Sequence, residues 1–349
     1  MPAVLLRSSR SVIVGLFLCL VMMGSEGAFG QGLGVGAFSR VGFDARGLAM
    51  GNALVASSST DVSPYYNPAL LPTATGQRVA GSAAVLAYDR QLQSLEFTTP
   101  IGPTAGVGLG LIHAGVSNID GRNADGVRTQ TLSTDEFALS LAFGNRFAER
   151  LSVGIGFTLY QSDVVPETSP VRGFGVDLGL TYRVTSQLKV AAAVSDLLAK
   201  YEWDTSSLNG QSRTDRFPVR VQVGGSYTLL DGRVHLLGEV ESRFVGRDRQ
   251  VVDRVIPTSG GPRQETRTES VLLHTVRGRM GAAYRPVDIL ALRAGFDRIG
   301  ADGTSGLRPT AGFGLRHELG DLKVRLGYAA ALEPYVRTVM HFGTIEVFL

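Results

Sequence analysis

The sequence predicts an all-β fold, a transmembrane antiparallel β-barrel of about fourteen strands. Three observations lead to this prediction: apolar residues alternate with small or polar ones, the alternating segments are long, and the connections between them alternate in length. Most segments have about ten to thirteen residues. Soluble strands average about five or six residues, whereas a tilted strand needs about nine to eleven to cross a membrane. Because lipid offers no partner for backbone polar groups, such strands must close into a barrel.

The alternation of apolar with small or polar residues recurs along the whole chain after residue 77. From Leu151 to Leu159 every second residue is apolar, and the residues between are small or polar. A period of two indicates a strand with two different faces, because a helix would place its apolar residues three and four apart. We expect strands at 78–88, 91–99, 104–116, 134–145, 150–161, 171–183, 187–196, 217–229, 233–245, 270–285, 287–297, 307–317, 321–331 and 339–349.

The connections between these segments form two sets. Residues 184–186 and 230–232 are typical of the short set, whereas residues 117–133, 197–216 and 246–269 belong to the long one. Short periplasmic turns and longer extracellular loops are typical of bacterial outer-membrane barrels. We therefore expect the short set at the periplasmic rim and the long set outside the cell.

The N-terminus is typical of an exported protein. A basic region precedes an apolar run, Val12 to Met23, and small residues at Ala28 and Gly30 follow it. This order indicates a secretory signal peptide, since a spanning helix would need about twenty apolar residues. We expect residues 1–30 to be a cleaved signal peptide, residues 31–77 an N-terminal segment and residues 78–349 the barrel, located in the outer membrane.

Composition excludes several classes of function. Cys19, the single cysteine, lies inside the predicted signal peptide, so the mature chain has no disulfide, thiolate metal site or cysteine nucleophile. The net charge of +3 is spread along the chain, whereas nucleic-acid binding needs a concentrated basic stripe. The five histidines stand singly, and no carboxylate cluster has metal-ligand spacing. We expect no enzyme activity, metal, cofactor or nucleic-acid partner.

Charged side chains on the strands are expected to face the lumen. A charge that faces lipid at mid-membrane costs about 2–4 kcal/mol for Arg or Lys, so the apolar face of each strand should face lipid. The predicted lumen charges are Asp177, Arg220, Glu239, Glu241, Arg277, Arg279, Arg293, Asp297, Arg316, Lys323, Arg325 and Glu346. Two interpretations remain open: ion pairs that brace the wall, or a charged path for a substrate.

Other lumen positions carry very small residues. They are Gly106, Gly108, Gly110, Gly154, Gly156, Ala191 and Ala193. Missing side chains leave room inside that part of the wall, so water, a ligand or a plug has to fill it.

The N-terminal segment carries a motif in two parts. Arg46, Met50 and Gly51 form the first part, and Asp61 followed by Asn67-Pro68-Ala69 forms the second. The chain thereby resembles the FadL-like outer-membrane barrel superfamily, and most closely its PorV/PorQ-type branch, which carries an Arg-x-x-Gly-Met-Gly-like stretch, an Asp and then Asn-Pro-Ala just before the first strand. Ala49 stands where that family commonly has glycine.

The resemblance implies that residues 31–77 form a small hatch folded inside the barrel. Small residues allow close backbone packing, and Asn67-Pro68 fixes a turn, because proline restricts its own φ and the residue before it. Arg46 and Asp61 are candidates for pairing with wall charges. The alternative is a periplasmic tail that does not plug the barrel.

The resemblance also implies the function. FadL-like barrels pass or bind small hydrophobic molecules, which predicts transport across the outer membrane. PorV-like proteins imply an alternative, a scaffold or shuttle component of a type IX-like secretion system that binds exported proteins and transports no small molecule. A structural barrel without cargo is a third possibility. The expected partners are outer-membrane lipid, the barrel-assembly machinery, and either hydrophobic small molecules or exported proteins.

Overall fold

The structure is a computed structural model that describes residues 34–58, 63–164, 169–204, 213–258, 261–300, 307–320, 322–333 and 338–349. Of residues 213, 247–258, 261–266, 268 and 270 only the backbone is described. The predicted signal peptide and Asp61 lie outside the described residues.

Fourteen antiparallel strands form a closed barrel, in which β1 pairs with the last strand, β16. Their bounds are β1 Arg78–Val85, β2 Arg90–Ile101, β3 Ala105–Arg122, β4 Arg128–Ala148, β5 Leu151–Asp163, β6 Val171–Arg183, β7 Leu188–Leu197, β10 Val219–Leu229, β11 Val234–Thr258, β12 Gly261–Val287, β13 Leu290–Ile299, β14 Arg308–Leu319, β15 Leu322–Leu332 and β16 Val339–Phe348. The predicted all-β fold, an antiparallel barrel of about fourteen strands, is therefore confirmed, and each expected strand corresponds to one strand of the barrel.

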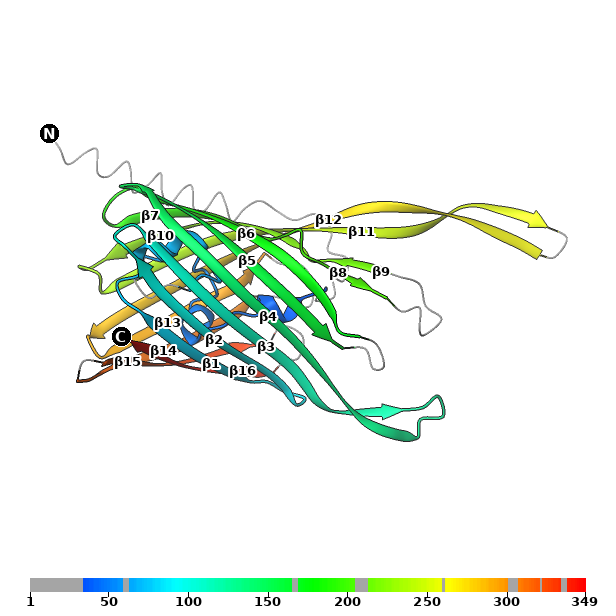
Figure 1. Ribbon diagram of the computed structural model, residues 1–349, viewed down its shortest axis with the longest axis horizontal. Coiled ribbons are helices and arrows are strands. Elements are labelled where there is room, and N and C mark those ends of the chain that lie inside the picture. Colours follow the sequence, from blue (N-terminus) through cyan, green and yellow to red (C-terminus); the bar gives the residue numbers. More distant parts are fainter. Residues whose placement is uncertain are drawn as a thin grey trace.

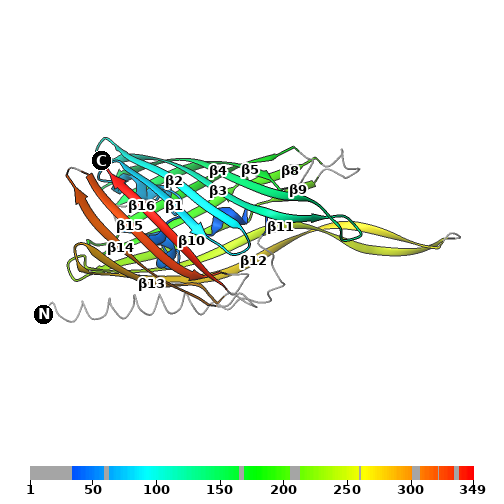
Figure 2. The ribbon, with the colours of Figure 1, turned by 90° about the horizontal axis from the view of Figure 1, so that it is seen from below.

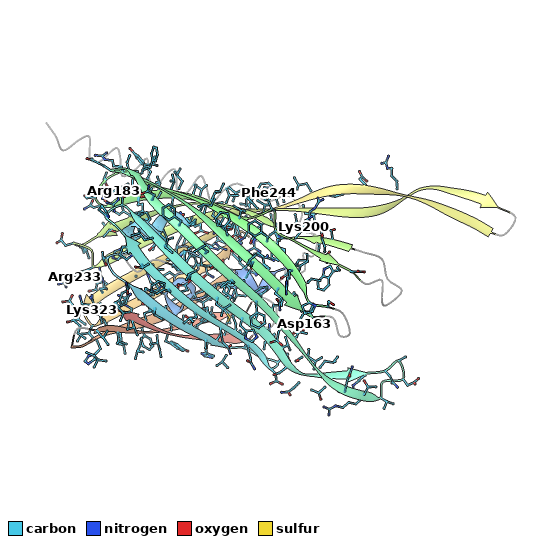
Figure 3. All side chains as sticks on the ribbon, viewed as in Figure 1. Asp163, Arg183, Lys200, Arg233, Phe244 and Lys323 are labelled. Carbon is cyan, nitrogen blue, oxygen red and sulfur yellow. The ribbon has the colours of Figure 1, made fainter. Side chains whose placement is uncertain are left out.

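The two ends of the barrel differ in the length of their connections (Figures 1 and 2). The short turns and the C-terminus lie at one end, and the long hairpins project from the other. Leu230, Asp231 and Gly232 form one of the short turns, with φ angles of 50°, 51° and 85°. In Figure 3, Arg183, Arg233 and Lys323 mark the short-turn end, whereas Asp163 and Lys200 lie toward the other end.

Two of the predicted long loops are instead strands. β3 and β4 continue pairing to Arg122 and Arg128, and β11 and β12 continue to Thr258 and Gly261. The ribbons that result project beyond the barrel (Figure 1). Their sequences do not alternate apolar with polar residues, so the alternating pattern did not reveal these strands, although β-branched residues such as Val255 favour extended backbone.

A third predicted loop, residues 197–216, contains a small hairpin. It consists of β8 (Lys200–Trp203) and β9 (Arg213–Arg216), which pair with each other and form a separate two-stranded sheet. The contacts of this hairpin are mainly with β6, at the long-loop end of the barrel.

The outer face of the barrel is apolar. Leu109, Leu141 and Phe157 are direct cross-strand partners on β3, β4 and β5, and their exposed fractions are 45%, 49% and 40%. The residues that alternate with them point inward and are small, for example Gly108 and Ala142. Large apolar side chains on the surface of a soluble monomer are seldom this contiguous.

Three short helices lie inside the barrel (Figures 1 and 2). They are η1 (Ala37–Arg40), α2 (Ala45–Ala49) and η2 (Pro68–Thr73), and we call the described residues 34–58 and 63–77 that contain them the inner segment. Side chains begin two of the helices: the carboxylate of Asp44 accepts from Gly47 N, and Asn67 Oδ1 accepts from Ala69 N at 2.9 Å. Among the described residues, no helix has the length and apolar character that crossing a bilayer requires.

Candidate functional site

The candidate site is the lumen, where the inner segment meets the barrel wall at two anchor points. The first anchor is Met50-Gly51. A Cβ atom added at Gly281 of β12 would lie 2.5 Å from Met50 O, and one added at Gly295 of β13 would lie 2.5 Å from Gly51 N. Gly51 itself has a φ of 63°, and its own Cβ would lie 2.5 Å from Phe296 O. Backbone therefore packs directly on backbone, which only glycine permits here.

The second anchor is Asn67-Pro68-Ala69, which packs against β5 and β6, separated from β12 by three strands around the wall. A Cβ atom at Gly154 of β5 would lie 2.4 Å from Ala69 N, and one at Gly179 of β6 would lie 2.0 Å from Asn67 Oδ1. Asn67 is fully buried and also donates to Val55 O at 2.9 Å. The side chain of Asn67 thus caps η2, connects two parts of the inner segment and packs against the wall.

Hydroxyl groups on the wall bind the backbone of α2. Thr344 Oγ1 accepts from Ala45 N at 2.8 Å. Thr310 Oγ1 accepts from Gly51 N at 3.1 Å and donates to Ala49 O at 3.0 Å. These contacts give hydrogen-bond partners to backbone groups at the two ends of α2, where a short helix leaves its N–H and C=O groups without partners of its own.

Charged wall residues also bind the backbone of the inner segment. Glu239 Oε2 accepts from Val55 N at 3.2 Å, and Lys189 Nζ donates to Ser57 O at 2.9 Å. Ser63 Oγ donates to Glu96 Oε1 at 2.6 Å. The inner segment is thus held mainly by backbone groups and hydroxyls.

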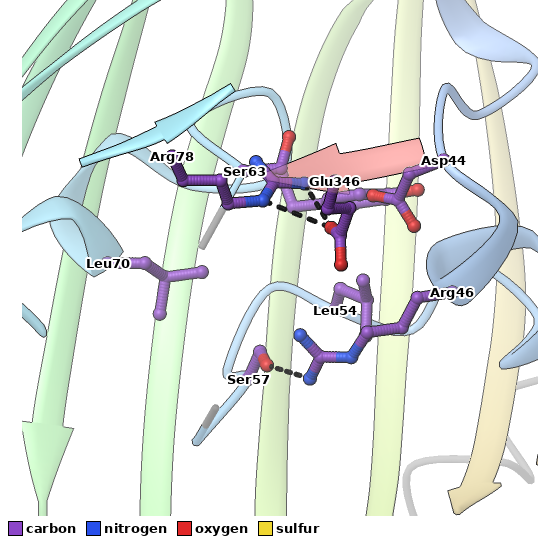
Figure 4. Close-up of a pocket in the computed structure, with 9 residues that line it drawn as sticks. Asp44, Arg46, Leu54, Ser57, Ser63, Leu70, Arg78 and Glu346 are labelled. Carbon is purple, nitrogen blue, oxygen red and sulfur yellow. Dashed lines mark hydrogen bonds and ion pairs between the residues drawn. The ribbon is translucent and has the colours of Figure 1, made fainter. Parts of the chain in front are cut away.

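Arg46 was expected to pair with wall charges. Its guanidinium donates to Ser57 Oγ at 2.8 Å, inside the inner segment (Figure 4). The second candidate, Asp61, lies outside the described residues. Asp44, two residues before Arg46, is buried, and this burial raises the pKa of its carboxyl group.

The predicted lumen charges are concentrated in an ion-pair network centred on Glu241. This residue has no exposed surface and contacts three guanidinium groups: Arg277 at 2.7 Å, Arg279 at 2.8 Å, and Arg243. Arg279 also pairs with Glu239. Because two carboxylates and their arginine partners are buried together, each charge depends on the others for its stability.

The network extends along the wall through further pairs. Asp297 accepts from Arg279 at 3.1 Å and from Arg308 at 3.2 Å, which links β12, β13 and β14. Arg220 on β10 pairs with Asp196 at 2.9 Å. Pairing of opposite charges favours the interpretation that the charges brace the wall.

A separate network lies beside the closing pair of strands. Arg78 contacts Glu346 at 2.5 Å and Glu96 at 3.2 Å, and Arg325 contacts Glu346 at 3.0 Å. Figure 4 shows Arg78 and Glu346 at the edge of a small cavity whose other lining residues belong to the inner segment. The volume of this cavity is about 10 Å³, the lower limit for one water molecule.

The remaining predicted lumen charges occupy different environments. Asp177 Oδ1 accepts from the backbone N–H of Asp196 at 2.9 Å. Arg293 is buried beside Gly314. Arg316 and Lys323 lie on the inward face of their strands. They are exposed near the short-turn rim, outside the packed part of the lumen.

Several wall residues of the site were not predicted. Glu96 and Arg243 lie on the inward face and could have been found from alternation, because they share a face with predicted neighbours. The roles of Thr310 and Thr344 depend on the path of the inner segment, which the wall sequence does not reveal. Within the described residues, no cluster of histidine, cysteine and acidic side chains could hold a metal ion.

Comparisons with known proteins identify the fold. The chain superposes on the toluene transporter TodX of Pseudomonas putida with a TM-score of 0.56 and 15% identity, covering 88% of this chain and 96% of that one. The toluene transporter TbuX of Ralstonia pickettii superposes with a TM-score of 0.52 and 16% identity, covering 88% of this chain and 97% of that one. A Pseudomonas aeruginosa FadL homologue superposes with a TM-score of 0.54 and 11% identity, covering 87% of this chain and 97% of that one.

The chain has the fold of these FadL-like barrels. No family model matches its sequence. No curated protein matches it either. The structures compared are transporters or channels, and they do not bear on the PorV/PorQ-type assignment, which stays a prediction.

Proposed function

We propose that this chain is an outer-membrane channel for small hydrophobic molecules, exported through a cleaved signal peptide. The observation that carries the proposal is a barrel with an apolar outer face whose lumen is filled by its own N-terminal residues. The fold it shares with toluene transporters supports the choice of hydrophobic cargo over ions or sugars. Closed barrels and apolar outer faces together fit a membrane environment.

In this proposal the inner segment is a hatch. Its two anchors lie on β12–β13 and on β5–β6, which β11, β10 and β7 separate in the barrel order. The segment therefore spans part of the lumen between two separate stretches of the wall. Transport requires it to shift, since the cavity between its residues and Arg78 and Glu346 of the wall has room for at most one water molecule.

A reversible tether tests both the channel and the hatch. A Cβ atom at Gly327 of β15 would lie 3.2 Å from Ala45 Cβ, slightly closer than the roughly 3.5–4.5 Å between the Cβ atoms of a disulfide, so a small shift allows a cross-link. The predicted mature chain has no cysteine, so Ala45→Cys with Gly327→Cys introduces a single pair. Cells that express this double variant should take up radiolabelled toluene slowly after oxidation and as fast as wild-type cells after reduction.

The controls separate the two claims. The Ala45→Cys single variant should be insensitive to oxidant. Equal uptake by cells with and without the wild-type protein would contradict the channel function. Rapid uptake by the oxidised, fully cross-linked protein would contradict only the hatch.

A further inference from the structure

Five aromatic rings form a continuous row at the long-loop end of the lumen. Phe38 of η1 lies 6.5 Å from Tyr160 of β5, measured between ring centroids, and Tyr160 lies 4.6 Å from Phe217. Phe217 lies 5.0 Å from Tyr201, which lies 5.9 Å from Trp203 on the same strand, β8. We call these five residues the outer aromatic row. It runs from the inner segment to the hairpin above it.

The hairpin is held closely against the inside of β6. A Cβ atom at Gly173 would lie 2.7 Å from Lys200 O, so β8 fits there only because the wall residue is glycine. Phe217 N donates to Ala199 O at 2.9 Å, which fixes Phe217 beside β8. The row is therefore positioned by packing on both sides.

Two polar atoms in the row lack the partners that such atoms usually have. Tyr201 is 1% exposed, and among the described residues neither its hydroxyl group nor Trp203 Nε1 has a hydrogen-bond partner. Other buried tyrosines are satisfied: Tyr160 donates to Asp196 at 2.6 Å and Tyr66 to Asn52 at 3.1 Å. Buried polar groups are nearly always paired, so two unpaired donors on one four-residue strand require an explanation.

We propose that Tyr201 and Trp203 form a polar subsite that binds small aromatic ligands bearing a neutral oxygen acceptor, such as aryl ketones, in preference to the matching hydrocarbons. This inference rests on the proposed channel function and adds a substrate class to it. The ligand ring packs against the rings of Tyr201 and Trp203, where edge and offset contacts are favourable. Its oxygen accepts from the tyrosine hydroxyl and the indole N–H.

The charges around the subsite favour a neutral ligand. Charges of both signs surround Tyr201: the carboxylate of Glu136 and the guanidinium of Arg40 act on it, and Asp215 is its direct cross-strand partner. An anionic ligand would be attracted by the cation and repelled by the carboxylates. The two donors are themselves uncharged, which suits a ketone or ester oxygen.

The single tryptophan of the chain gives a direct measurement, because Trp203 is part of the subsite. Fluorescence of the purified full-length protein is titrated with acetophenone and with α-methylstyrene, which has nearly the same shape without the oxygen. The measured quantity is the ratio of the two dissociation constants. Comparing this ratio between wild type and Tyr201→Phe cancels the partition of each ligand into detergent.

Tyr201→Phe keeps the ring and removes one donor, so it should shift the ratio about 3- to 10-fold toward the hydrocarbon, the effect of one uncharged hydrogen bond. Tyr227→Phe is the matched control, because Tyr227 OH bonds Gln187 at 3.2 Å on an exposed surface. That variant should leave the ratio unchanged.

The outcomes distinguish the subsite from the channel. An unchanged ratio in Tyr201→Phe, or no response of Trp203 to either ligand, overturns the polar subsite and leaves the toluene uptake result as it stands. A shifted ratio supports the subsite even in a protein that fails the uptake test.

Discussion

At the scale of single residues, glycine at the wall determines where the inner segment can lie. Gly154 and Gly156 point inward from the same strand, two positions apart, yet only the first contacts the inner segment. A Cβ atom at Gly154 would lie 2.4 Å from Ala69 N, whereas one at Gly156 would lie 3.4 Å from Asp177 Cβ, an ordinary contact. The same residue type therefore has different roles at neighbouring positions.

This difference predicts the behaviour of two alanine variants. Gly154→Ala should weaken the seating of η2 by about 1–3 kcal/mol, because the backbone of the inner segment has to move away from the added methyl group. Limited proteolysis of purified protein should then cleave residues 34–77 roughly 5- to 150-fold faster. Gly156→Ala should be cleaved at the wild-type rate. Equal rates for both variants would contradict the anchor.

Alternation along each strand was sufficient to assign most wall residues to a face before the structure was known. Glu239, Glu241, Arg277 and Arg279 all point inward, and their buried pairing follows from the cost of placing charges in lipid. The partners of the inner segment could not be assigned in this way. Thr344 binds Ala45 N across 299 positions of sequence, and no local pattern encodes that contact.

At the scale of elements, the ion pairs join neighbouring strands on one side of the barrel. Glu241 on β11 contacts Arg277 and Arg279 on β12, and Arg279 continues to Asp297 on β13. Cross-strand hydrogen bonds already connect these strands, so the charges add a second layer of contacts on their inner face. Breaking the network should loosen several strands together.

Glu241→Gln tests how much this network contributes. Removing the charge leaves Arg243, Arg277 and Arg279 without a shared carboxylate, and breaking a buried pair from one side costs about 3–5 kcal/mol. Urea unfolding of the reconstituted barrel should report a loss of this size. Asp120→Asn is the control, because Asp120 pairs with Arg122 at 2.6 Å on an exposed ribbon, where a pair contributes about 0–1 kcal/mol. Similar losses in both variants would contradict a bracing role.

The ribbons show where prediction of elements failed and why. Strands inside the wall need one apolar face, and that need produces the alternation that revealed them. Beyond the rim, β3 pairs only with β4, and β11 pairs only with β12. Their sequences therefore carry β-branched residues and turn signals without alternation, and a reading based on alternation assigns them to loops.

At the scale of the whole molecule, the inner segment connects separate stretches of the barrel wall. Its first anchor contacts β12 and β13, its second contacts β5 and β6, and Val55 contacts β10 between them. The row of aromatic rings then connects η1 to the hairpin at the outer mouth, where the ring of Phe217 fills the space beside Gly36. A ligand that displaces Phe217 therefore acts directly on the N-terminal end of the inner segment.

The outer surface of the whole barrel gives the last prediction, which concerns the membrane itself. Leu141 is 49% exposed in the middle of β4, and Val127 is 61% exposed in the turn between β3 and β4, beyond the rim. In water, arginine at either position would be tolerated, because both side chains already lie on the surface. In a bilayer, Leu141→Arg should cost about 2–4 kcal/mol, whereas Val127→Arg should cost almost nothing. Folding into lipid vesicles, followed by the gel mobility shift of the folded barrel, measures the difference, and equal folding of the two variants would show that this band does not face lipid.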